Sequence, residues 1–101
     1  MSSAFQTKIP NSLNEHWMPF SSNKDFKKNP RIIVEAEGIY LKTHQGNSLI
    51  DGSSGLYCNP LGHGRKEIIN AIKSQLEKLD YTMPFQQGFG GSFELATMIA
   101  K

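Results

Sequence analysis

The chain has 101 residues, close to the commonest size of a single domain, so its length excludes two independent hydrophobic cores. Lys and Arg total 11 against 9 Asp and Glu, and the basic residues are scattered, so the net charge of +2 does not indicate a nucleic-acid partner. The single cysteine, Cys58, excludes an internal disulfide and favours a cytoplasmic location. The longest aliphatic run, residues 32–34, is far shorter than a membrane helix requires, and the first ten residues do not resemble an export signal.

The N-terminal third predicts little regular structure. Residues 1–12 are small and polar, and we expect a flexible arm there. Ser12 and Glu15 have the spacing of a capping box, which predicts a short helix from residue 13 that Pro19 ends. Residues 20–30 are mostly polar, with Phe26 as the one apolar anchor, so we expect a connecting loop.

Three short apolar segments follow, at residues 32–34, 39–41 and 48–50. Turn signals separate them, so they predict three antiparallel strands in a small meander. Ile39 and Leu41 fall on one face of this sheet, which therefore needs a covering layer.

Two glycine-rich stretches and two helices are expected in the rest of the chain. Residues 51–64 and 81–91 contain repeated turn signals, and long ordered loops often carry function. After Arg65 an apolar residue recurs every fourth position, which predicts an amphipathic helix. Ser92 is the expected N-cap of a last helix that is apolar on almost every side. The pattern as a whole predicts an α+β piece.

The three histidines lack the spacing of a metal site, so no metal is expected. His44 falls at a predicted hairpin tip, where we expect a solvated side chain. For His63, an imidazole presented at a helix N-terminus is one hypothesis. A hydrogen-bonded loop histidine is favoured, because no neighbouring carboxylate can be identified from the sequence.

The remaining candidate residues each have a structural and a functional interpretation. Cys58 lacks an adjacent activating group, so a buried structural thiol is favoured over a nucleophile. The glycines at 88, 90 and 91 suggest a phosphate cradle, but their spacing matches neither the dinucleotide fingerprint nor the P-loop. Phe20, Tyr57 and Phe85 stand in irregular segments and are candidates for a ligand-pocket wall, with core packing as the commoner role of each.

Read as a string, the chain resembles the class III pyridoxal-phosphate aminotransferases, in their omega-amino acid:pyruvate (β-alanine:pyruvate) branch. The resemblance runs in order from about residue 13 to the end of the sequence. The matching stretches are residues 16–20 (HWMPF), 30–31 (PR), 36–40 (AEGIY), 49–52 (LIDG), 55–58 (GLYC) and 61–64 (LGHG).

The resemblance implies a homodimer of the aspartate-aminotransferase fold (fold type I), in which this segment supplies an entry helix and the small sheet beside the active site. It also implies transfer of an amino group from a primary amine to pyruvate by pyridoxal 5'-phosphate (PLP). Phe20, Leu56 and Tyr57 match positions that line the substrate pocket, and Phe85 matches an aromatic that reaches the partner subunit's site. Tyr57 replaces the commoner Trp of this branch, which bears on pocket size.

In this family the residues that bind the cofactor phosphate, its ring and its Schiff-base lysine match no position of these 101 residues. We therefore expect residues 13–101 to be the amino-terminal segment of an aminotransferase, without catalytic or cofactor-binding residues and inactive alone. An autonomous small interaction module remains the alternative, because the length allows a core.

Overall fold

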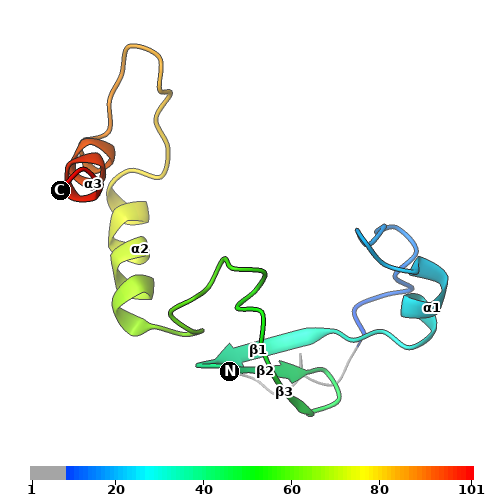
Figure 1. The fold of residues 1–101 in the computed structure, drawn as a ribbon. Helices are drawn as coiled ribbons and strands as arrows, with labels where there is room; N and C mark the ends of the chain where they lie inside the picture. Colours follow the sequence, from blue (N-terminus) through cyan, green and yellow to red (C-terminus); the bar gives the residue numbers. More distant parts are fainter. Residues whose placement is uncertain (1–8) are drawn as a thin grey trace. The chain divides into compact units, whose positions relative to one another are not determined.

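A computed structural model describes residues 9–101, so most of the expected arm, residues 1–8, lies outside the described residues. The chain divides into two compact units, Met1–Arg65 and Lys66–Lys101, and each is described by itself. The first unit contains a short helix and a three-stranded sheet, and the second contains two helices (Figure 1). The expected α+β composition is therefore confirmed.

The first helix does not lie where the capping box predicted it. Residues 13–15 form a bend and a turn, residues 16–18 have no regular structure, and Leu13 has a φ of 63°, which a right-handed helix does not allow. The polar side chains of this segment form short-range hydrogen bonds. Asn11 Oδ1 accepts from the Leu13 N–H at 2.8 Å, and the Ser12 hydroxyl donates to Glu15 at 3.3 Å. Asn and Ser that bond nearby backbone groups favour a turn over a helix, which explains the wrong prediction.

The helix is found instead inside the expected loop, as α1 (Asn23–Lys28). Ser22 stands at its N-cap and donates its hydroxyl to Asp25 at 2.8 Å. Lys27 and Lys28 occupy its last turn, where the helix dipole favours cations. The buried Asn23 completes the anchor, because its side-chain amide bonds both the N–H and the carbonyl of Met18, at 2.8 and 2.9 Å.

The predicted meander is confirmed (Figure 1). Strands β1 (Ile33–Glu37), β2 (Tyr40–Thr43) and β3 (Ser48–Ile50) pair antiparallel in the order β1-β2-β3. Glu37 pairs with Tyr40 across a two-residue turn, and this turn is the attachment point for the loop that follows β3.

His44, expected to be solvated, is buried at the start of the β2–β3 turn, with 7% of its surface exposed. Its N–H donates to the carbonyl of Ile32 at 2.8 Å, which draws the turn onto the segment that precedes β1. This backbone bond between distant residues explains the burial. Nδ1 of His44 has no hydrogen-bond partner in the described part of the chain.

The second unit confirms the two helices, α2 (Lys66–Lys78) and α3 (Gly90–Ile99). The start of α3 differs from the prediction: Phe89 is its N-cap, and Ser92 lies in the first turn. The Ser92 hydroxyl donates back to the Phe89 carbonyl at 2.7 Å instead of accepting from a helical N–H. The two glycines that precede Ser92 adopt helical geometry, so the helix starts earlier than the capping pattern indicated.

Apart from Pro30, no apolar side chain among residues 9–101 is buried. Ile72 and Leu76 of α2 and Phe93 and Ile99 of α3 are all more than half exposed in the isolated chain. The apolar faces thus have no covering layer within the described residues. In this part of the chain no helix is both long and apolar enough to cross a membrane.

Candidate functional site

The loop from Asp51 to His63 returns to its starting point. At one end the N–H of Asp51 donates to the carbonyl of Ile39 at 2.8 Å. At the other end His63 exchanges both backbone hydrogen bonds with Gly38, at 2.8 and 2.9 Å. Both ends are therefore fixed to the turn between β1 and β2, the arrangement of a compact Ω-loop.

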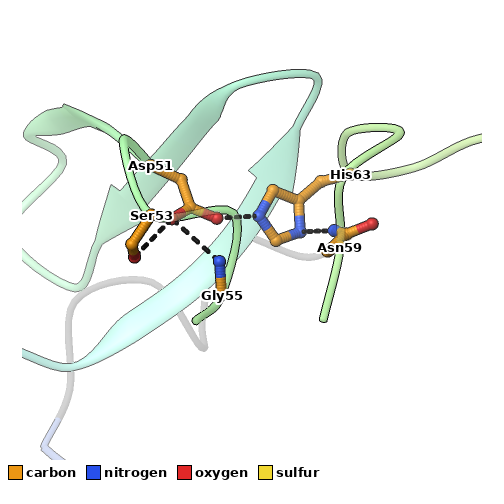
Figure 2. Close-up of polar contacts among 5 residues, drawn as sticks. All are labelled: Asp51, Ser53, Gly55, Asn59 and His63. Carbon is orange, nitrogen blue, oxygen red and sulfur yellow. Dashed lines mark hydrogen bonds and ion pairs between the residues drawn. The ribbon is translucent and has the colours of Figure 1, made fainter. Parts of the chain in front are cut away.

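A chain of side-chain hydrogen bonds closes the same loop (Figure 2). The His63 ring nitrogen Nε2 lies 2.8 Å from Asp51 Oδ2, and Nδ1 lies 2.8 Å from the amide nitrogen of Asn59. Because the carboxylate only accepts and the amide NH₂ only donates, this arrangement assigns the proton of a neutral imidazole to Nε2. The hydrogen-bonded loop histidine is confirmed, and Asp51 is the carboxylate that the sequence did not reveal.

Asp51 is the centre of this network. Its Oδ1 also accepts from the N–H of Gly55 at 3.1 Å and from the hydroxyl of Ser53 at 3.4 Å. The hydrogen bond from His63, followed by that from Gly55, holds the pKa of the Asp51 carboxyl below its ordinary value of 3.8. The side chains of Asp51 and His63 are 7% and 22% exposed, so the pair is largely shielded from water.

Between Asp51 and Asn59 the backbone forms a left-handed turn, residues 54–57. The φ angles from Ser54 to Tyr57 are 53°, 60°, 58° and 68°, all in the left-handed region. The Tyr57 N–H donates to the Ser53 carbonyl at 3.0 Å, which is the spacing of a helical turn. A residue with a Cβ costs roughly 1–2 kcal/mol in this conformation, so the surrounding contacts must hold the turn in place.

The turn presents two of the predicted pocket residues outward. Leu56 is 74% exposed and Tyr57 is 86% exposed. The adjacent Cys58 is exposed as well, with its thiol 3.6 Å from the Leu56 carbonyl, so the expected buried thiol is wrong. All three side chains are therefore accessible to solvent in the described part of the chain.

The structure brings together only Leu56 and Tyr57 of the four predicted site residues. Phe20 stands on a separate segment just before α1, fully exposed and with a φ of 50°. Phe85 belongs to the second unit, is exposed, and precedes Gln86, which has a φ of 60°. Left-handed backbone at or beside every one of these residues is a signal that sequence patterns did not give.

The described residues do not fit a resident PLP. A Cβ at Gly91 would collide with the ring of Phe89, and one at Gly88 would meet the ring of Phe93 at 3.2 Å. Gly88 and Gly91 thus make room for aromatic rings, and only Gly90 of the three glycines has open space at its Cβ position, so they do not form an open phosphate cradle. Lys73, like the other lysines of α2, is exposed. Residues 9–101 also contain no cluster of three side chains suited to a metal ion.

A hollow with a volume of about 570 Å³ lies elsewhere, against the sheet. Glu35, Glu37 and Lys42 contribute to its lining, and Lys42 lies 3.7 Å from a Glu35 oxygen. None of the four predicted pocket residues lines it. It is therefore not the wall that the sequence analysis indicated.

No family model matches the chain. It is 51% identical over 89 residues to the beta-alanine–pyruvate aminotransferase of Pseudomonas aeruginosa, a match that covers 88% of this chain and 20% of that protein. It is 46% identical over 87 residues to the omega-amino acid–pyruvate aminotransferase of Pseudomonas putida, covering 86% of this chain and 19% of that protein. The chain thus spans about a fifth of the length of the curated relatives it matches.

The solved structures that match the chain are also those of aminotransferases. The (S)-enantioselective omega-transaminase of Thermomicrobium roseum matches with a TM-score of 0.78 and 28% identity, over 84% of this chain and 20% of that chain. The taurine:2-oxoglutarate aminotransferase of Bifidobacterium kashiwanohense, solved with PLP and glutamate, matches with a TM-score of 0.75 and 30% identity, over 88% and 20%.

Proposed function

The chain belongs to the class III aminotransferases, and on that premise we propose that it forms the substrate-wall segment of a homodimeric enzyme that transfers an amino group from an omega-amino acid or another primary amine to pyruvate. The observation that carries the proposal is the 51% identity over 89 residues to a beta-alanine–pyruvate aminotransferase. The chain is only 37% identical to a putrescine–pyruvate enzyme of the same organism, which favours the omega-amino acid branch.

In this proposal Leu56 and Tyr57 contact the carbon chain of the amine. Their exposure in the isolated chain leaves both side chains free to face a substrate. Apolar walls of this kind exclude water and select substrates by size. Phe20 contributes a second wall, and Phe85 reaches the partner subunit's pocket.

PLP, when bound, supplies the electron sink for amino-group transfer. Because the residues described above do not fit that group, we assign its binding to the part of such an enzyme that corresponds to the other four-fifths of the relatives. The role of this chain is then to shape the pocket, and alone it transfers no amino group.

A chimera tests this proposal. The matched stretch of the chain replaces the corresponding stretch of the Pseudomonas aeruginosa enzyme, and alanine formed from β-alanine and pyruvate is measured. We expect a dimer that binds PLP and turns over, while the 101-residue chain mixed with the same reagents forms no alanine. A folded, PLP-loaded chimera without turnover would contradict the proposal, and so would turnover by the chain alone.

A further inference from the structure

We propose that Asp51, Asn59 and His63 are positioning residues that hold the left-handed turn 54–57 and thereby determine which amines the wall formed by Leu56 and Tyr57 accepts. This inference rests on the function proposed above. It assigns a role to a polar cluster that does not itself touch substrate.

The contacts of the cluster enclose the turn from both sides. Before the turn, Asp51 Oδ1 accepts hydrogen bonds from the Ser53 hydroxyl and from the N–H of Gly55. Gly55 is the second residue of the turn. After the turn, the Asn59 N–H donates to the Ser54 carbonyl at 2.9 Å. The His63 ring joins the two sides, because it bonds Asp51 and Asn59 at once.

The turn needs such a clamp because its conformation is unfavourable for three of its four residues. Gly55 has no Cβ and adopts a positive φ at little cost. Ser54, Leu56 and Tyr57 carry a Cβ, so the same positive φ is unfavourable for each of them. Without the clamp, these residues would move toward right-handed or extended backbone. The side chains of Leu56 and Tyr57 would then point in other directions.

The geometry argues against a catalytic or binding role for the cluster itself. Both ring nitrogens of His63 are already hydrogen-bonded, so neither is free to take a proton from a substrate. The cavity beside Asp51 and His63 has a volume of about 40 Å³, enough for a water molecule and too small for an amine substrate. The cluster therefore acts through the turn.

The first test uses NMR on the full chain. In the native chain we expect the neutral His63 ring to carry its proton on Nε2, and the Tyr57 amide to be protected from exchange. Asp51→Ala and His63→Ala should each accelerate that exchange by about tenfold or more, because each variant removes at least the charge-assisted hydrogen bond between the two side chains. Asp51→Asn keeps an acceptor oxygen, so its Tyr57 exchange rate should lie between those of the native chain and of Asp51→Ala. Asp80→Ala, at an exposed aspartate in the second unit, is the control.

Unchanged exchange in both alanine variants would overturn the proposal. Absence of Tyr57 protection in the native chain would overturn it too, because the clamp lies within residues 51–63 and the Gly38 turn and needs no other part of an enzyme. Neither result depends on amino-group transfer, so a failed clamp is distinguishable from a failed function.

The second test measures specificity in the chimera. Asp51→Asn and His63→Asn should change the ratio of kcat/KM for β-alanine to that for 1-phenylethylamine by about tenfold, at unchanged PLP absorbance. Asp80→Asn should leave the ratio unchanged. Equal losses for both amines would show a merely structural role and overturn the assignment.

Discussion

Gly62 allows the most direct perturbation of the closed loop. It has a φ of 87°, and a Cβ built on it would lie 3.2 Å from the Gly38 carbonyl oxygen. That oxygen accepts the His63 N–H at 2.8 Å, so it cannot retreat without lengthening the bond that closes the loop. Gly62→Ala therefore introduces backbone strain and weakens the bridge between His63 and Gly38 at the same time.

Two other glycines separate these effects. Gly38 has a φ of 58° and open space around its Cβ position, so Gly38→Ala introduces the strain alone, about 1 kcal/mol. Gly62→Ala adds the weakened backbone bond, for about 2 kcal/mol in total. Gly52 has neither a positive φ nor a near neighbour, so Gly52→Ala should be neutral or slightly stabilising.

Amide hydrogen exchange at positions 38 and 63 measures the free energy of opening the bridge. We expect exchange to accelerate about 30-fold in Gly62→Ala and about 5-fold in Gly38→Ala, with no acceleration in Gly52→Ala. Equal effects at Gly62 and Gly38 would refute the reasoning, because the carbonyl contact would then contribute nothing.

Three further predictions concern the clamp, the wall and the exposed apolar faces. The carboxyl carbon shift of Asp51 should titrate below pH 3.8, because the pKa of this carboxyl is lowered. The stabilisation that the ionised carboxylate gives the loop is therefore present above pH 3.8 and is lost as the pH falls through the lowered pKa. His63→Ala should raise the inflection, and an inflection at or above pH 3.8 in the native chain would contradict this prediction. In the chimera, Tyr57→Trp should lower kcat/KM for 1-phenylethylamine by about tenfold relative to β-alanine, since the larger ring narrows the pocket, and an unchanged ratio would argue against Tyr57 as a wall. The isolated chain should bind an apolar dye and self-associate, because Pro30 is the one buried apolar residue among residues 9–101; a monomer without dye fluorescence in sedimentation and fluorescence measurements would contradict that expectation.

The sequence was sufficient to predict the elements whose structure follows from a local residue pattern. The meander follows from apolar segments separated by turn signals, and α2 follows from an apolar residue at every fourth position. The prediction of a helix near residue 13 was wrong, because the side chains of Asn11 and Ser12 accept hydrogen bonds from the backbone of a turn there. The helix that does form depends on Asn23, whose amide bonds the backbone of Met18 five residues earlier, and no periodicity reveals such a contact.

The candidate site shows the same division. The sequence predicted Leu56 and Tyr57 as pocket residues through their resemblance to a family motif, and the comparisons confirm the family alone. It did not show the left-handed turn that carries them, because only Gly55 among its four residues signals a positive φ. It also did not pair His63 with Asp51, which stands twelve positions earlier.

By itself the sequence determined the class of fold, the strand order and the aminotransferase family, because each depends on patterns that neighbouring residues carry. Only the tertiary structure decided that His44 is buried, that Cys58 is exposed, and that Asp51 and His63 close one loop. The physical reason is that burial and pairing depend on backbone bonds between distant segments, such as those of Gly38 with His63.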